Sequence, residues 1–230
     1  MQKAFALAAL MGAAAAASAD IRITEWMYNS DVGEYFELTN TGNTAVDLTG
    51  WVYDDDSRIS SPSSATGSST EGLDLSSFGL VQPGESVVVT EALAIDFRDS
   101  WNLPASVRVL GGYANNLGRA DEINVFDNGG NLVDRLTFGD QAFPGTIRTA
   151  DRAGVPLSLA ALGANAPAQW GFADVVTGGG PYDLSGVLGG QGYFTNTAGQ
   201  PGNPGYFFVP APGSVALLGL GALAAGRRRR

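Results

Sequence analysis

The chain alternates between short runs of β-branched and aromatic residues and clusters of Asn, Gly and Asp. The clearest runs are IRITEWMYN at 21–29, GEYFELTNTG at 33–42 and VDLTGWVYDDD at 46–56. Runs of this length, bounded by turn-forming residues, predict β-strands joined by turns. Several such strands at this spacing predict an antiparallel β-sandwich, so the expected fold class is all-β.

The middle of the chain adds three local predictions. QPGE at 82–85 is a turn signal before a valine-rich strand, and DNGG at 127–130 separates two strand-like runs, which predicts a β-hairpin. The segment 91–101 has apolar residues at near-helical spacing, which predicts one short helix. The Ser/Gly-rich stretch 57–72 predicts a loop.

The sequence contains no cysteine and no histidine. Without disulfides the fold must rest on a hydrophobic core, which the roughly 185 residues between the two ends are enough to build. The missing histidine excludes Ser-His-Asp and Cys-His catalysis, and imidazole or thiolate zinc sites are excluded as well. The remaining kinds of functional site are catalytic carboxylates and metal sites with oxygen ligands.

Charge is distributed unevenly along the chain. All 23 acidic residues lie between Asp20 and Asp183, whereas Lys3 and the four arginines Arg227–Arg230 lie at the ends. The part between the ends has eight arginines against 23 carboxylates, a formal charge of −15. This charge argues against binding to a nucleic-acid backbone, which needs clustered cations. A negative charge of this size is typical of an exported soluble domain or of a domain that binds divalent cations.

The N-terminal residues 1–19 have the layout of a secretory signal peptide. Lys3 precedes an uncharged apolar run that ends in Ala17-Ser18-Ala19. A positive start, an apolar run and an A-x-A site in this order predict cleavage after Ala19.

Four motifs resemble, in order, the lamin-tail-type domain family: ITEWMYN (23–29), GEYFELTNTGNTAVDLTGW (33–51), QPGESVVV (82–89) and GNLVDRLTFGD (130–140). Trp170 and the segment 200–204 match the family's later Trp-containing strand and Pro-Gly-x-Pro-like segment. The predicted domain therefore covers residues 20–205. The resemblance implies an immunoglobulin-like β-sandwich that binds or scaffolds and has no catalytic residues, so the chain is expected not to be an enzyme.

The C-terminal residues 206–230 have three parts. They are the motif Val209-Pro210-Ala211-Pro212-Gly213, the uncharged run Ser214–Gly226, and Arg227-Arg228-Arg229-Arg230. Cationic flanks stay on the cytoplasmic side of a membrane. The run is therefore predicted to be a transmembrane helix whose orientation the arginines set, with the acidic domain outside.

This three-part layout resembles a PEP-CTERM sorting signal. The resemblance implies that an exosortase, a membrane-embedded protease, cuts near the Pro-x-Pro motif and releases the protein to the cell surface or the exopolysaccharide matrix. Ala211 stands where that family usually has Glu. The predicted partners are the exosortase, the membrane through the C-terminal helix, and exopolysaccharide or other surface proteins, with no nucleic acid.

One acidic cluster is a candidate metal site, formed by Asp54, Asp55 and Asp56. Ca²⁺ prefers oxygen ligands and is the candidate cofactor, with weak binding expected. The spacing of an EF-hand loop is absent, and successive strand residues point to opposite faces. A solvated acidic loop therefore remains the alternative, and no other cofactor is expected.

Two further residue groups carry alternative functions. An exported hydrolase would need a carboxylate pair across a cleft, for which the candidates, expected at exposed strand positions, are Glu25, Glu34 and Glu37. A glycan-binding protein, with or without Ca²⁺, could use a platform of tryptophans, although the sandwich core is the favoured place for Trp26, Trp51, Trp101 and Trp170.

Overall fold

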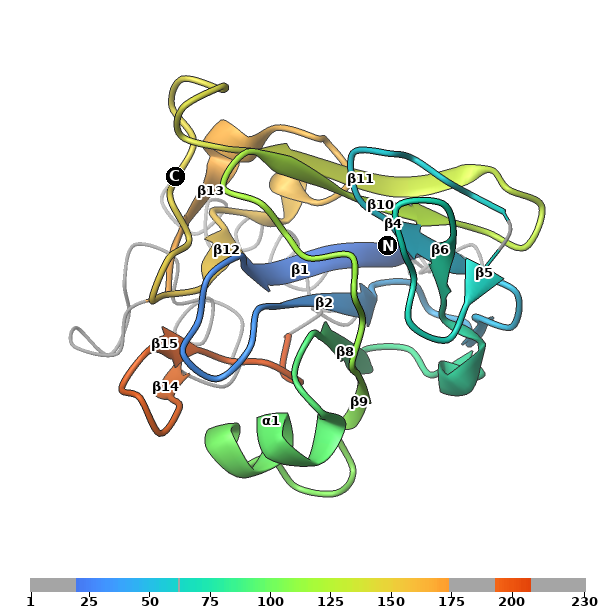
Figure 1. Cartoon of the computed structure of the whole chain (residues 1–230), viewed down its shortest axis with the longest axis horizontal. Helices are drawn as coiled ribbons and strands as arrows, with labels where there is room; N and C mark the ends of the chain where they lie inside the picture. Colours follow the sequence, from blue (N-terminus) through green and yellow to red (C-terminus); the bar gives the residue numbers. More distant parts are fainter. Residues whose placement is uncertain (1–19, 62, 174–192, 208–230) are drawn as a thin grey trace, which may run out of the picture.

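The computed structural model of the chain describes residues 20–61, 63–173 and 193–207, and in these ranges strands predominate (Figure 1). The first sheet has the spatial order β13 (Trp170–Phe172), β12 (Gly154–Pro156), β1 (Ile21–Met27), β2 (Tyr35–Asn40), β8 (Ser86–Thr90) and β9 (Arg108–Gly111). The second sheet has the order β11 (Leu132–Phe138), β10 (Asp121–Phe126), β4 (Val52–Asp54), β6 (Gly72–Asp74) and β5 (Ser63–Ser64).

Smaller elements connect or flank the two sheets. Two strand pairs are formed by β14 (Phe194–Thr195) with β15 (Pro201–Gly202), and by β3 (Val46–Asp47) with β7 (Leu80–Val81). The described helices are α1 (Ala94–Trp101) and the 3-10 turns η1 (Ser76–Phe78), η2 (Leu159–Ala161) and η3 (Pro167–Gln169).

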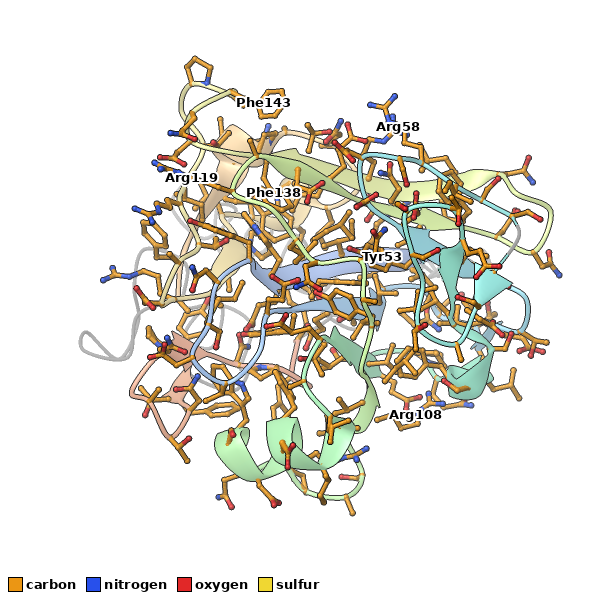
Figure 2. The ribbon with its side chains drawn as sticks, viewed as in Figure 1. Tyr53, Arg58, Arg108, Arg119, Phe138 and Phe143 are labelled. Atoms are coloured by element: carbon orange, nitrogen blue, oxygen red, sulfur yellow. The ribbon has the colours of Figure 1, made fainter. Side chains whose placement is uncertain are left out.

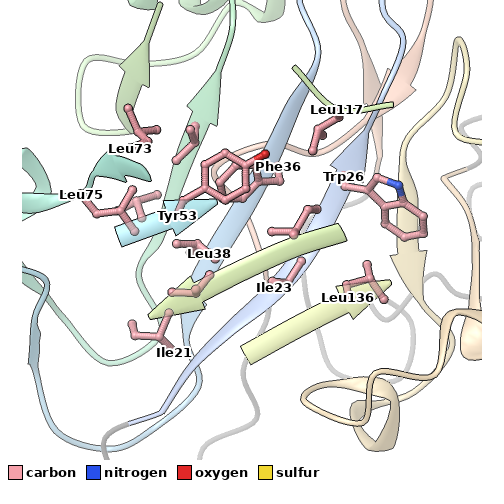
Figure 3. Packing of buried hydrophobic residues seen from close by; sticks show 14 of the residues in the cluster. Ile21, Ile23, Trp26, Phe36, Leu38, Tyr53, Leu73, Leu75, Leu117 and Leu136 are labelled. Carbon is pink, nitrogen blue, oxygen red and sulfur yellow. The ribbon is translucent and has the colours of Figure 1, made fainter. Parts of the chain in front are cut away.

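The main core lies between the two sheets, as predicted for a β-sandwich. Side chains of β1 and β2, such as Ile23, Phe36 and Leu38, pack against side chains of the second sheet, such as Tyr53 and Leu136 (Figure 3). All five are buried. Burial of apolar surface of this kind is the dominant favourable term in folding, and it holds this fold without disulfides.

The opposite face of the first sheet is covered as well. A second cluster packs there and includes Tyr35, Val88, Phe97 and Trp101. In Figure 1, α1 and the β14–β15 pair lie on this side of β1 and β2. A sheet buried on both faces has no solvent-facing row of residues, so every residue of β2 and β8 is buried.

The predicted hairpin and helix are confirmed. β10 and β11 pair antiparallel around residues 127–130, where the Asp127 carboxylate accepts hydrogen bonds from the backbone N–H groups of Gly129 and Asn131. α1 lies within the predicted segment 91–101, and Asn102 ends it in the left-handed conformation. This is a common way for a helix to terminate.

Two expectations about the sheets are wrong in part. The sandwich is not fully antiparallel, because β8 pairs parallel with β9, and β5 pairs parallel with β6. Parallel neighbours need a crossover connection, and α1 provides it between β8 and β9. The segment 57–72 is not only a loop, because it contains β5 and the first residue of β6.

Some predicted segments lie outside the described residues. They include the signal peptide 1–19, the motif Val209–Gly213, the membrane helix Ser214–Gly226 and Arg227–Arg230. Within the described ranges, no helix combines the length and the apolarity needed to cross a bilayer.

Candidate functional site

The described chain ends in a segment that leads directly into the tail, residues 193–207, called here the C-terminal strap. Its β14–β15 pair lies against the first sheet, where the Ala153 N–H donates to the Pro201 carbonyl at 2.9 Å. The Ser30 hydroxyl donates to the Gln200 side chain at 2.8 Å. The strap is therefore hydrogen-bonded to the domain through both backbone and side chains.

Two glutamates of the first sheet hold the end of the strap. Glu25 of β1 accepts hydrogen bonds from the backbone N–H of Asn203 at 3.0 and 3.2 Å. Glu37 of β2 accepts from the backbone N–H of Gly205 at 2.7 Å. Both glutamates are 1% exposed, so these hydrogen bonds are shielded from water.

The same glutamates also bond to the sheet that carries them. The Tyr35 hydroxyl donates to Glu25. The hydroxyls of Thr24 and Thr39 donate to Glu37 at 2.5 and 3.3 Å. Each carboxyl group thus bridges the sheet and the strap, and each has several hydrogen-bond donors, as a buried polar group requires.

Burial changes the acidity of this pair. It raises the pKa of Glu37 to about 7. The hydrogen bonds from the Thr24 hydroxyl and the Gly205 N–H lower this pKa and so partly oppose the rise. Burial, reinforced by the nearby Glu37 charge, raises the pKa of Glu25 well above its ordinary value. Two carboxyls in one buried site disfavour simultaneous ionisation, so the pair holds a proton more readily than exposed glutamates do.

A third buried glutamate lies near the other sheet. Glu34 accepts hydrogen bonds from the Tyr113 hydroxyl at 3.0 Å and from the Leu117 N–H at 2.5 Å. Burial raises its pKa to about 8, and the charge of Glu91 contributes. Its bonding partners are protein groups, which is the arrangement of a structural carboxylate.

The expectation that Glu25, Glu34 and Glu37 occupy exposed strand positions is wrong. All three are at most 5% exposed. The physical reason is the strap together with α1 and the 113–117 segment, which cover faces that a simple two-layer sandwich would leave open. Sequence periodicity predicted solvent-facing positions because it does not register covering segments that are distant along the chain, such as Tyr113 at 79 positions from Glu34 and Asn203 at 178 positions from Glu25.

The predicted metal residues separate into two groups. The Asp54 carboxylate accepts hydrogen bonds from the Ser57 hydroxyl at 2.6 Å, the Ile59 N–H at 2.5 Å and the Asn115 amide at 3.0 Å. Its oxygens are thus used within the protein. Asp54 acts as an anchor for the segment that follows β4.

Asp55 and Asp56 lie beside a residue that the sequence analysis did not include. One carboxylate oxygen of each, with one of Asp121, falls within 4.8 Å of the others, in the part of the chain that the structure describes. Burial raises the pKa of Asp121 to about 6, and the charges of Asp55 and Asp56 add to the shift. Ca²⁺ takes oxygen ligands of this kind. The calcium site predicted at Asp54, Asp55 and Asp56 stays a prediction, and the structure groups Asp121, instead of Asp54, with the other two.

The tryptophans lie mainly in the core. Trp26 packs against Phe138 and Trp170 at ring-centroid distances of 5.4 and 5.0 Å. Trp101 packs edge-on against Phe194 of the strap at 5.7 Å. Core placement is confirmed for these three tryptophans, whereas Trp51 is partly exposed. An exposed stacking platform of all four does not form.

Arginines at the periphery pair with acidic side chains. Figure 2 shows Arg58, Arg108 and Arg119 at the outside of the molecule, with Tyr53 and Phe138 inside. Arg58 contacts Glu122 at 2.7 Å, Arg108 contacts Glu85 at 2.7 Å, and Arg119 contacts Asp140 at 2.6 Å. The Arg58 hydrogen bonds lower the pKa of Glu122 to about 2. These three arginines form ion pairs with carboxylates of the domain itself.

The strap contacts were not predictable from the local sequence. Asn203 lies 178 positions from Glu25, and Gly205 lies 168 positions from Glu37. The glycine and proline content of 200–204 marks tight turns, and its family resemblance placed it within the domain, but neither signal identifies the residues that bind it. Asp121 was missed because it follows Asp56 by 65 positions and reaches it only through the β4–β10 pairing.

Comparison with known proteins gives two matches. The family model of the Lamin Tail Domain matches residues 14–140, more than half of the chain. The PEP-CTERM protein-sorting motif matches residues 208–230. Neither a curated protein nor a solved structure matches the chain significantly. The first match covers β1 to β11, and the second begins directly after the strap. The chain therefore belongs to the lamin tail domain family and ends in a PEP-CTERM sorting motif.

Proposed function

We propose that this chain is a non-catalytic exported protein of the cell surface or extracellular matrix, whose immunoglobulin-like sandwich is a binding or structural module. The tail anchors it transiently in the membrane, and an exosortase then cuts near Pro210-Ala211-Pro212 and releases it. The observation that carries this proposal is the match of residues 208–230 to the PEP-CTERM sorting motif, directly after the described strap residues 193–207.

The order of the segments supports this route. A signal peptide at 1–19 brings the acidic domain across the membrane first. The uncharged run Ser214–Gly226 then halts in the bilayer as a transmembrane helix. The arginines behind it resist crossing, because each cation costs roughly 2.5–3.5 kcal/mol at a helix centre on insertion scales.

A non-catalytic role is supported by how the acidic side chains are used. Carboxylate-based hydrolysis needs two carboxyls facing each other across a cleft that admits substrate. Glu25 and Glu37 instead accept bonds from the strap, and Glu34 accepts bonds from Tyr113 and Leu117. With these contacts, the three glutamates stabilise the fold.

Calcium-dependent binding of a glycan or another surface polymer is the second candidate. The grouping of Asp55, Asp56 and Asp121 favours it, since a cation there would lower the repulsion between three carboxylates. The ligand would then contact the rim of the second sheet near β4 and β10.

The route is tested by changing the charge of the tail. Replacing Arg227–Arg230 with four glutamines should let the tail slip through the membrane, so that uncut precursor appears outside the cell. Replacing the same residues with four lysines keeps the positive charge and serves as the matched control. Cell fractionation with an antibody against the domain measures both. Normal release of the glutamine variant would contradict the proposed anchoring.

A further inference from the structure

Carboxyl groups gather at one end of the sandwich around a single short segment, residues 115–118. Each of its four residues donates a hydrogen bond to a different acidic side chain. The donors are the side-chain amides of Asn115 and Asn116 and the backbone N–H groups of Leu117 and Gly118, and their acceptors are, in this order, Asp54 at 3.0 Å, Glu91 at 3.1 Å, Glu34 at 2.5 Å and Asp121 at 2.5 Å. One oxygen each of Asp55, Asp56 and Asp121 lies within 4.8 Å of the others. These six carboxyl groups are called here the acidic end.

The arginines of the described residues leave the acidic end unpaired. Their ion pairs use other carboxylates, namely Asp20, Glu85, Glu122 and Asp140. Arg58 lies close enough to Asp56 for that charge to raise its pKa, but its guanidinium is hydrogen-bonded to Glu122. Like charges held this close together repel one another, and a bound cation relieves that repulsion.

An independent observation points to a ligand at the same place, and it concerns the hydroxyl of Tyr53. The side chain is 0% exposed, and within the described structure its hydroxyl has no hydrogen-bond partner. A buried tyrosine hydroxyl usually finds such a partner, and one that has none calls for a water molecule or an ion beside it.

The register of the second sheet places Tyr53 and Asp121 on the same face. Tyr53 of β4 is paired with Val125 of β10, so these two side chains leave the sheet on its core side. Asp121 lies four residues before Val125 on the same strand, and side chains at even spacing share a face. In Figure 3 the hydroxyl of Tyr53 points to the side on which Leu117 lies.

The neighbours of Tyr53 lead to the same carboxyl groups. Its ring centroid lies 5.9 Å from that of Tyr113, whose hydroxyl donates to Glu34 at 3.0 Å. Burial raises the pKa of Tyr53 well above its ordinary value, and the charges of Asp121 and Asp55 are the next causes of the rise. The unpartnered hydroxyl therefore faces the acidic end from inside the core.

We propose that the acidic end is a Ca²⁺ site in which Asp55, Asp56 and Asp121 hold the cation, while the Tyr53 hydroxyl hydrogen-bonds with a water molecule on the cation's inner side. This inference rests on the second candidate function, the calcium site, and adds to it a neutral residue of the core. Ca²⁺ takes about six to eight oxygen ligands, so water completes the shell that three carboxylates begin. Groups that bond to a metal's ligands from behind typically change its affinity by about 10–100-fold.

Scanning calorimetry of the full-length chain in a mild detergent, over a series of CaCl₂ concentrations, tests the role of Tyr53. A cation that binds only the folded state raises the melting midpoint once its concentration exceeds the dissociation constant. For Tyr53→Phe we expect this threshold concentration to be about tenfold higher than for the wild type. The midpoint without Ca²⁺ should stay the same or rise, because the variant removes a buried hydroxyl that has no protein partner.

Tyr113→Phe is the matched control. It removes the same hydroxyl from the neighbouring ring, but this hydroxyl is bonded to Glu34. The control should therefore lower the midpoint without Ca²⁺ by about 2–4 °C and leave the Ca²⁺ threshold within about twofold of the wild type. KCl at matched ionic strength separates cation binding from general screening.

The near-ultraviolet absorption of tyrosine reports the hydroxyl directly. Ca²⁺ should change this absorption in the wild type and in Tyr113→Phe, because Tyr53 gains a hydrogen-bond partner in both. It should leave the absorption of Tyr53→Phe unchanged. A purely structural role of Tyr53 would produce no such Ca²⁺-dependent signal.

The outcomes separate this inference from the calcium site on which it rests. An unchanged Ca²⁺ threshold in Tyr53→Phe, or an equal rise of the threshold in both variants, would overturn the inference and leave a site at the three aspartates standing. A wild type that responds to CaCl₂ no more than to KCl, in both midpoint and absorption, would refute the calcium site and the inference with it. The proposed export route would be unaffected by that result.

Discussion

Glu37 on β2 accepts a hydrogen bond from the backbone N–H of Gly205 at 2.7 Å, although 168 positions separate the two residues. The bond joins the second strand of the domain to the last turn before the tail. Glu25 makes the equivalent bond to Asn203 from the neighbouring strand. The polar face of β1 and β2 is therefore an internal surface, and the root of the sorting tail is part of the folded domain.

Stability should rise on acidification from pH 8 to pH 5. Burial raises the pKa to about 8 for Glu34, about 7 for Glu37, and about 6 for Asp121 and Asp134. In the unfolded chain these groups have pKa values near 4. The folded state thus binds protons more tightly, and the stability so gained is complete below about pH 4 and lost as pH rises through the folded values.

Thermal melts of the domain at several pH values check this. We expect the melting midpoint at pH 5 to exceed that at pH 8 by about 5 °C or more. Glu34→Gln should raise the midpoint at pH 8 and have little effect at pH 5, because it removes a carboxyl whose pKa burial raises to about 8. A midpoint that falls steadily from pH 8 to pH 5 would contradict the buried placement of these carboxyls.

Core packing at the Trp26 site should dominate the stability of the sandwich. Trp26 is fully buried and packs on Phe138 and Trp170. Trp26→Ala should lower the free energy of unfolding by about 3–5 kcal/mol, through lost burial and the cavity left behind. Leu80→Ala is the control, since Leu80 is 58% exposed, and should change it by less than about 0.5 kcal/mol. Denaturant titration measures both, and equal effects would refute the core assignment.

Calcium binding, which stays a prediction, should depend on Asp121 and not on Asp54 oxygens. Calorimetry on the domain is expected to show a weak site, with a dissociation constant of about 10⁻⁴–10⁻³ M. The site should be lost in a triple Asp→Asn variant at positions 55, 56 and 121. A tight site that survives this triple change would place the ligands elsewhere.

Asp54→Asn serves as the comparison variant for that experiment. The Asp54 carboxylate accepts bonds from Ser57, Ile59 and Asn115. The variant should therefore lower thermal stability while a metal site, if formed, keeps its affinity. Loss of Ca²⁺ binding in Asp54→Asn, with unchanged thermal stability, would show that Asp54 is a metal ligand and not a structural anchor.

The sequence predicted local structure well where the signal is local. The hairpin at 127–130 follows from an Asp-Asn-Gly-Gly turn, and α1 follows from apolar spacing. The burial of Glu25 and Glu37 was not predictable, because it depends on a strap that arrives from the other end of the domain. The parallel pairing of β8 with β9 was missed for a related reason: it depends on how α1 crosses over, which strand composition does not encode.

The tail is proposed to be a temporary anchor that is cut near Pro210-Ala211-Pro212. Intact-mass measurement of the mature protein recovered from the cell surface or medium tests it most directly. We expect an N-terminus at Asp20 and a C-terminus between Pro210 and Gly213. A mature protein that still carries Arg230 would mean a permanent anchor, and the sorting account would be contradicted.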